Sequence, residues 1–167
     1  MQIEQQANPE LQKLADLIGD IKFAMLTSAD HEGTLRSRPM STMQLDADGN
    51  LWFFTSISSG KMDEAQEHTH VNVSYSRPDK QDYASVSGTA SVVRDRQKMQ
   101  SLWTAWIKPW FPQGIDDPDL VLLKVQIDEF EYWDAPGGAV KRGYGLAKAM
   151  VTGKTDALGQ NQRTRLH

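Results

Sequence analysis

Two stretches of the sequence carry residue types that could hold a phosphate group. Arg36 and Arg38 stand two residues apart in a segment expected to be a strand, so both side chains should point to one face. The hydroxyl-rich segment from Thr55 through Ser59 to Lys61 leaves the next strand and enters the start of a helix. Unpaired N–H groups and a partial positive charge at a helix start favour an anion, although the spacing is not that of a P-loop. These residues predict a phosphate site, for which a serine-rich helix cap with solvated basic residues is the alternative.

Histidines and clustered carboxylates give a weaker signal. His68 and His70 form a His-x-His pair, but no third ligand follows at a recognisable spacing. Asp116, Asp117 and Asp119 form an acidic cluster that lacks the ligand order of an EF-hand. The sequence therefore predicts no metal site. It identifies no catalytic residue, because it does not show which side chains lie close together.

The bulk composition narrows the possible classes of function. The chain has 167 residues, of which 39% are hydrophobic and 24% charged, and these values are typical of one globular domain. The net charge of -4 argues against non-specific binding to nucleic acid. The absence of cysteine excludes disulfides and thiolate chemistry. We recognise neither a signal peptide nor an apolar run of the ~20 residues that a membrane helix needs, so we expect a cytoplasmic protein without nucleic-acid or membrane partners.

The phosphate-binding candidates have to be positioned by strands. Apolar alternation and turn residues predict strands at residues 21–27, 35–45, 51–55, 71–75, 83–93 and 121–127, the last continued by 131–134. Helices are expected at residues 8–19, 58–68, 95–106 and 147–150. Because the links between strands are too short for parallel crossovers, we predict a mainly β fold, an antiparallel barrel with short flanking α-helices. One domain would span residues 1–155, followed by a polar C-terminal tail at 156–167.

Short motifs with a fixed order run along almost the whole chain, from about residue 10 to 155. They are Arg38-Pro39-Met40, Trp52-Phe53-Phe54-Thr55-Ser56, Ser59-Gly60-Lys61, Val71-Asn72-Val73, Val86-Ser87-Gly88-Thr89-Ala90, Trp110-Phe111-Pro112-Gln113-Gly114, Asp117-Pro118-Asp119-Leu120 and Glu131-Tyr132-Trp133-Asp134. The series resembles the general stress protein family of FMN-binding split barrels. That family is a branch of the pyridoxamine 5'-phosphate oxidase-like superfamily, and the resemblance implies a split β-barrel.

The resemblance also implies a homodimer with FMN at the subunit interface. The residues that would bind the FMN phosphate are Arg38, Thr55, Ser56, Ser59 and Lys61. The residues whose backbone would meet the polar edge of the isoalloxazine are Pro39, Met40, Ser41 and Thr42, and the ring would pack beside Phe54. The aromatic residues that would close the pocket from the second subunit are Trp103, Trp110, Phe111 and Trp133.

The chain departs from the oxidase branch of this superfamily. Gly60-Lys61 stands where that branch has Arg-Lys, Met43 stands where it has a lysine, and nothing matches its C-terminal tryptophan and arginine that grip pyridoxal phosphate. These departures argue against pyridoxamine phosphate oxidation. Three functions stay open: an FMN-dependent oxidoreductase or stress-response flavoprotein with an unknown small-molecule electron donor or acceptor, a flavin-binding or storage protein without turnover, and a split barrel that binds haem or a deazaflavin.

Overall fold

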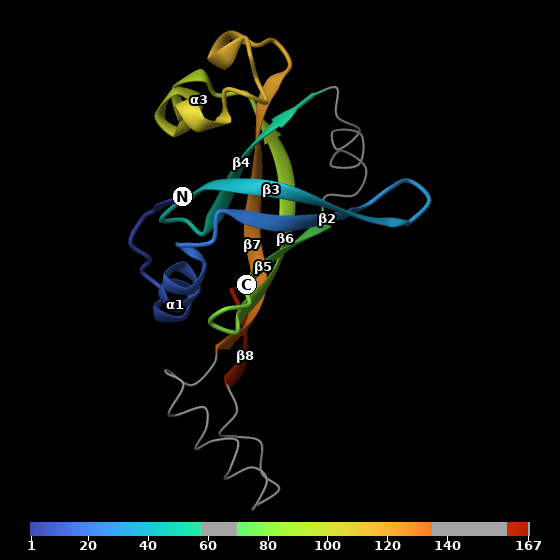
Figure 1. Ribbon diagram of the computed structural model, residues 1–167. Coiled ribbons are helices and arrows are strands. Elements are labelled where there is room, and N and C mark those ends of the chain that lie inside the picture. The colour runs from blue at the N-terminus through green and yellow to red at the C-terminus, as the bar shows by residue number, and fades with distance from the viewer. Residues whose placement is uncertain (58–69, 135–159, 167) are drawn as a thin grey trace, which may run out of the picture.

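The computed structural model describes residues 1–57, 70–134 and 160–166, and Figure 1 shows their arrangement. Six antiparallel strands close into a barrel in the order β3-β2-β5-β6-β7-β4, with β3 and β4 completing the circle. The barrel strands are β2 (Phe23–Ala29), β3 (Leu35–Leu45), β4 (Asn50–Ser56), β5 (His70–Arg77), β6 (Asp82–Val93) and β7 (Leu120–Asp134). The predicted mainly β barrel is confirmed.

Two short strands extend this sheet. β1 (Gln2–Ile3) runs parallel to the end of β3, and β8 (Gln160–Arg165) pairs antiparallel with the end of β7. Neither was expected from the sequence, which placed only a polar tail beyond residue 155. The segments expected as strands at 121–127 and 131–134 form one continuous strand, β7.

Helix α1 (Pro9–Ile18) begins where the sequence indicates. The Asn8 side chain accepts hydrogen bonds from the backbone N–H groups of Glu10 and Leu11, and Pro9 occupies the first turn. Leu14 and Ile18 of its apolar stripe are fully buried and pack into the same core cluster as the side chains inside the barrel. The helix lies at the β3–β4 turn, where Leu11 approaches Gly49, and so covers this end of the barrel.

Helix α3 (Arg96–Leu102) belongs to a second, separate core. Met99 and Leu102 pack with Met43, Trp52 and Phe54 on the outer side of β3 and β4. Figure 1 shows α3 and α1 on opposite sides of the barrel. The expectation of a helix over 95–106 was wrong at its end, because Trp103 adopts an extended backbone (φ -64°, ψ 131°) and the chain continues into the 3-10 helix η1 (Ala105–Ile107).

The barrel opens where β3 and β4 separate. Their pairing runs from Leu45–Leu51 to Thr42–Phe53, with a register shift beside Met43. Beyond Phe53, β4 continues to pair with β7 as far as Ser56, while β3 stays paired with β2. Among the described residues, the two strands therefore form no ladder past Thr42 and Phe53. This gap is called the β3–β4 split below.

Candidate functional site

A pocket of about 390 Å³ lies over the β3–β4 split. One wall comes from β3 and β4 on either side of the gap, and the opposite wall comes from the segment that follows α3. The lining residues are Phe23, Pro39, Met40, Ser41, Met43, Phe54, Thr55, Ser56, Trp106, Ile107, Trp110 and Phe111. Eight of the residues predicted from the sequence are thereby brought together: Pro39, Met40, Ser41, Phe54, Thr55, Ser56, Trp110 and Phe111.

Side chains from both faces of the barrel wall reach this pocket. Met40 belongs to the core inside the barrel, and Thr55 shares its face with Phe53 of that core. Phe54 and Met43 belong to the outer core beneath α3. The pocket therefore passes through the split rather than resting on one face of the sheet, and both backbone edges of the split border it.

Three predicted hydroxyl groups have different surroundings. The Ser56 hydroxyl donates to the Asp119 carboxylate, and Thr55 is only 2% exposed. The Thr42 hydroxyl lies inside the barrel, 2.8 Å from the Tyr75 hydroxyl, so only its backbone remains for a contact at the split. Burial, which outweighs the hydrogen bond with Thr42, raises the pKa of the Tyr75 hydroxyl. This pair is therefore a neutral, buried part of the core.

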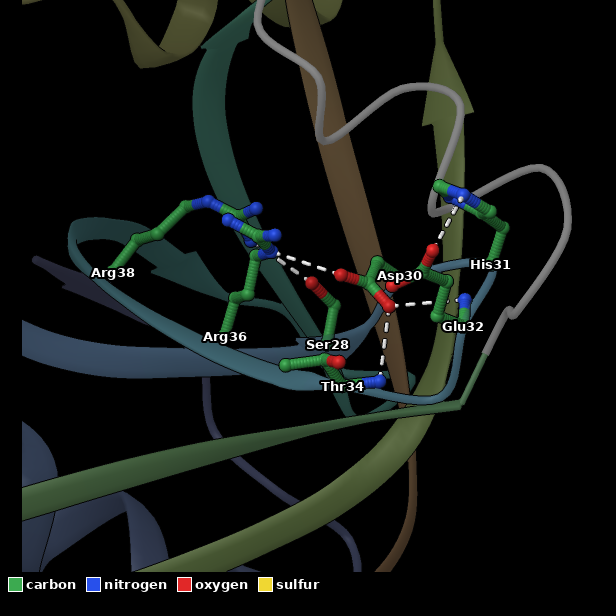
Figure 2. Close-up of polar contacts among 7 residues, drawn as sticks. All are labelled: Ser28, Asp30, His31, Glu32, Thr34, Arg36 and Arg38. Atoms are coloured by element: carbon green, nitrogen blue, oxygen red, sulfur yellow. Dashed lines mark hydrogen bonds and ion pairs between the residues drawn. The ribbon is translucent and has the colours of Figure 1, made fainter.

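Arg38 is half-buried beside the pocket and is not among its lining residues. It shares its strand face with Met40, which does line the pocket. Its Nη1 atom donates to the Ser28 hydroxyl at 2.9 Å, and Figure 2 shows this contact next to Arg36. Because Ser28 is the next-to-last residue of β2, this hydrogen bond holds the guanidinium near the β2–β3 turn, on the side of the barrel that lies away from α1 in Figure 1.

Arg36 occupies the same face, two residues nearer the β2–β3 turn. Its Nε atom donates to Asp30 Oδ2 at 3.0 Å (Figure 2). The other carboxylate oxygen accepts from the backbone N–H groups of Glu32 and Thr34, at 3.0 and 2.9 Å. The hydrogen bond from Arg36 and those from the backbone outweigh desolvation and hold the pKa of Asp30 below its usual value. Asp30 is therefore an anionic anchor for both the turn and Arg36.

An edge-to-face chain of rings forms the outer rim of the pocket. The ring centroids of Phe23 and Trp106 lie 5.6 Å apart, and those of Trp106 and Trp110 lie 5.3 Å apart. All three side chains are between 42% and 60% exposed. Trp110 and Phe111 had been expected to reach the pocket from a second subunit. In the structure, Trp110 and Phe111 of the same chain line it, because the segment after α3 folds back over its own barrel.

The remaining predicted aromatic residues lie outside the lining. Trp103 packs edge-to-face on Phe54, with 5.7 Å between ring centroids, and so supports the pocket from behind. Trp133 pairs with Tyr83, whereas Phe54 pairs with Leu122, so Trp133 stands at the opposite end of β7. Within one chain it is remote from the pocket. Ser59 and Lys61 lie outside the described residues, as do His68 and the helices expected at 58–68 and 147–150.

Sequence reasoning missed Phe23, Trp106 and Ile107 as pocket residues. Phe23 reaches the pocket because it pairs with Ser41 across β2 and β3, a register that the sequence does not show. Trp106 had been assigned to the end of the helix expected at 95–106, and Ile107 lies just beyond that expected end. The cluster of tryptophans was the available signal, but it did not indicate which rings share a wall.

The described lining contains hydroxyl, thioether, aromatic and aliphatic side chains but no histidine, lysine, arginine or carboxylate. Such a lining can enclose a flat apolar ligand and offer it hydrogen bonds from Ser41, Thr55 and Ser56. It supplies no side-chain acid or base to a bound molecule. No helix of the described residues is both long and apolar enough to cross a membrane.

Residues 9–157 match the family of proteins described as pyridoxamine 5'-phosphate oxidase like. The chain therefore belongs to this family, as the motif series indicated. It is 30% identical over 155 residues to protein bli-3 of Neurospora crassa, a match that covers 87% of this chain and 74% of that protein.

Solved structures with the same fold include general stress proteins. A structure from Jannaschia sp. CCS1, named for general stress protein 26, has a TM-score of 0.76 and 27% identity, covering 93% of this chain and 97% of that one. The general stress FMN/FAD binding protein of Xanthomonas citri has a TM-score of 0.66 and 26% identity, covering 78% of this chain and 93% of that one. These similarities agree with the predicted split barrel.

Proposed function

We propose that this protein is a flavoprotein that binds FMN in the pocket at the β3–β4 split. The observation that carries the proposal is the pocket itself, which gathers Pro39–Ser41 from one strand and Phe54–Ser56 from the other. Two structural relatives support it by their names, one as an FMN/FAD binding protein and one, at 14% identity, as an FMN binding protein of the oxidase-related group.

The pocket fits a flavin in size and in chemical character. Its volume of about 390 Å³ lies within the range of about 300–1,000 Å³ that is usual for small-molecule sites. Phe54 and Phe111 offer apolar contacts to a ring system, and the backbone along Pro39–Thr42 follows the edge of the split. A polar edge of the isoalloxazine would meet these backbone groups, while the apolar part of the ring lies against the aromatic wall.

Arg38 would hold the phosphate, together with Ser59 and Lys61 from the segment after β4. A guanidinium can donate two parallel hydrogen bonds to a phosphate, and Arg38 is kept in place by Ser28. Thr55 and Ser56 would add hydrogen bonds where β4 leaves the split. In this arrangement the phosphate lies toward the β2–β3 turn and the ring lies toward α3.

The exposed rim of the pocket supports a homodimer with FMN at the subunit interface. Phe23, Met25, Trp106 and Trp110 are each at least 42% exposed. Contiguous apolar rings on a soluble surface are typical of interfaces. A second copy seated over this rim would bury the rings and close the pocket, and only from such a copy could Trp133 reach it.

When bound, a flavin supplies the redox chemistry by accepting or donating hydride or single electrons. The chain's own residues would then position the ring and exclude water from one of its faces. Because the described lining offers no acid or base, we propose an oxidoreductase that exchanges electrons with a small molecule, without proton transfer from a side chain. The same lack of ionisable lining groups favours a second candidate, a flavin-binding or storage protein without turnover of its own.

A spectrum and a titration test the proposal. The visible spectrum of the purified protein should show oxidised flavin, or added FMN should quench fluorescence with saturation at about one FMN per chain. Anaerobic mixing with NADH or NADPH then separates the two candidates, since a storage protein would not be reduced at a useful rate, whereas an oxidoreductase that uses either donor would be reduced and would pass the electrons to an added acceptor. A colourless protein that ignores FMN contradicts the proposal, and a haem or deazaflavin spectrum would replace it.

A further inference from the structure

The apolar side chains of the pocket differ in exposure between its inner wall and its rim. On the inner wall, Met43, Phe54 and Ile107 are no more than 8% exposed. The three rings of the rim stay 42–60% exposed although they contact one another. A flavin ring that packs on the inner wall would therefore leave one face toward the rim. There the rim rings could contact a second flat molecule.

The rim and the inner wall offer no charge to such a molecule. Among the residues that the structure describes, the pocket lining contains no histidine, lysine, arginine or carboxylate. Lys108 is not a lining residue, although it follows Ile107, which is. Arg36 and Arg38 lie toward the β2–β3 turn, where the FMN phosphate is proposed to bind. An anionic group placed against the rim would lose water without gaining a partner, so the rim favours a neutral molecule over an anion.

The same neutral lining limits which reactions the pocket can support. Oxidising an alcohol requires a base to remove the O–H proton, and reducing an aldehyde requires an acid to protonate the alkoxide. Reducing a quinone requires neither, because the oxygens of the product are phenolic, with a pKa of about 10 as in tyrosine. The anion left by hydride transfer can therefore take its proton from water. Quinone reduction thus fits a lining whose described residues include no acid or base.

We propose that the substrate is a neutral quinone, which lies between the open face of the flavin ring and the rim formed by Phe23, Trp106 and Trp110. This inference rests on the proposed FMN function and names its substrate class. The quinone takes a hydride from the reduced flavin, so that both carbonyl groups become C–O single bonds and the flavin is oxidised. One proton from water completes the hydroquinone, and a nicotinamide donor reduces the flavin again. In the proposed dimer, the second copy covers this space from the outside.

Binding of menadione, a neutral naphthoquinone, to the oxidised protein saturated with FMN tests the site without turnover. Calorimetric titration should give saturation, and Trp106→Ala should weaken binding about ten-fold because an aromatic contact is lost. Trp106→Phe, which keeps a ring, should recover most of the affinity. Flavin absorbance verifies the FMN content of each variant. The matched control is Leu35→Ala, because Leu35 is 72% exposed at the far end of β3 and does not line the pocket.

Charge and kinetics give two further results. Naphthoquinone sulfonate, which carries an anionic group, should bind at least about ten-fold more weakly than menadione. Under anaerobic conditions, menadione should reoxidise the dithionite-reduced protein at a rate that saturates with its concentration, and Trp106→Ala should raise the half-saturating concentration about ten-fold. A rate that never saturates, equal binding of the sulfonate, or an unchanged affinity in Trp106→Ala would overturn the assignment.

A failure of the flavin proposal is distinguishable from a failure of this inference. If FMN binds but menadione does not, the flavin proposal stands and the quinone site is refuted. If FMN does not bind, menadione is titrated into the flavin-free protein. Menadione binding that Trp106→Ala weakens about ten-fold would then support a quinone site at the rim without the flavin. Menadione binding that is absent, or is the same in both proteins, would overturn it.

Discussion

Arg38 connects the pocket to the charged end of the barrel, and its surroundings set what a substitution should do. Its guanidinium donates to the buried Ser28 hydroxyl. A phosphate bound there would meet a cation that is already positioned. Arg36, two residues nearer the β2–β3 turn, is paired with the Asp30 carboxylate.

The first prediction concerns the phosphate residues. Arg38→Ala and Lys61→Ala should each weaken FMN binding by about 1.5–3 kcal/mol, the usual contribution of a hydrogen bond to a charged group. Fluorescence titration with FMN measures the change. Riboflavin, which lacks the phosphate, serves as the control ligand and should bind all three proteins equally. Normal FMN affinity in both variants would show that the phosphate lies elsewhere.

Asp30 gives a prediction on pH. Its pKa in the folded protein lies below the usual value, chiefly because Arg36 donates to it. A depressed folded pKa stabilises the protein above the unfolded pKa of about 3.9, and this stabilisation is lost as the pH falls through the folded value. Stability should therefore decline below about pH 4, and Arg36→Ala should make the decline shallower.

Urea unfolding between pH 7 and pH 3 measures this effect. The comparison is between wild type, Arg36→Ala and Lys22→Ala, where Lys22 is an exposed cation away from the β2–β3 turn. The first two proteins should differ more at pH 7 than at pH 3, because protonated Asp30 no longer attracts Arg36. A difference that is the same at every pH would show that Arg36 acts through packing alone.

At the scale of elements, the sequence predicted those helices and strands that depend mainly on residues close together in the chain. Asn8-Pro9 and the apolar spacing predicted α1, and alternation predicted the six barrel strands. The end of α3 was missed because it depends on Trp103 packing against Phe54, a contact between distant segments. Strand β8 was missed because its sequence has no apolar alternation. It is held by its pairing with β7 and by Arg163 and Arg165, each 2.6 Å from Glu129 of that strand.

The same contrast between neighbouring and distant residues holds for the candidate site. Residues next to each other in one strand, such as Pro39–Ser41 or Phe54–Ser56, were predicted together and do lie together. The β3–β4 split could not be predicted, because it depends on which strand each edge pairs with. Phe23 lines the pocket because of the β2–β3 register, and Trp106 lines it because the segment after α3 folds back over the barrel. Both depend on contacts between residues that are distant in the sequence.

Gly88 provides a prediction about strand geometry. A Cβ atom at this position would lie 2.2 Å from the Gln126 carbonyl oxygen and 2.9 Å from the Val125 side chain, at the register shift between β6 and β7. Gly88→Ala should therefore force the two strands apart and lower the free energy of unfolding by about 1–3 kcal/mol, as overpacking does. Ser91→Ala, three residues along β6, is the control. An unchanged urea midpoint for Gly88→Ala would mean that the shift relaxes freely.

At the scale of the whole molecule, two apolar cores have different structural roles. The core inside the barrel and under α1 stabilises the strands, while the outer core under α3 fixes Phe54 and the segment that carries Trp110. The pocket lies where the two cores meet, at the β3–β4 split. A ligand there touches parts of both cores, so its binding should stabilise the whole fold by mass action.

The rim of the pocket argues for association between two copies. Met25 is 42% exposed and pairs with Pro39, and it lies two residues from Phe23 on the same face of β2. Met25→Lys would place an ammonium group where a second copy is proposed to sit, and burying such a charge without a partner is costly. The variant should raise the dimer dissociation constant at least about ten-fold. If FMN lies at the interface, its affinity should fall in parallel.

Analytical ultracentrifugation at several protein concentrations, with and without FMN, measures both effects. Gln97→Lys adds the same charge to the exposed side of α3 and should leave association and FMN binding unchanged. A dimer that survives Met25→Lys would place the interface on another face of the barrel. A monomeric variant that binds FMN normally would instead show that one chain completes the pocket, as its own Trp110 and Phe111 make geometrically feasible. If Met25→Lys weakens both dimer formation and FMN binding, the second copy helps to form the FMN site at the β3–β4 split of the first.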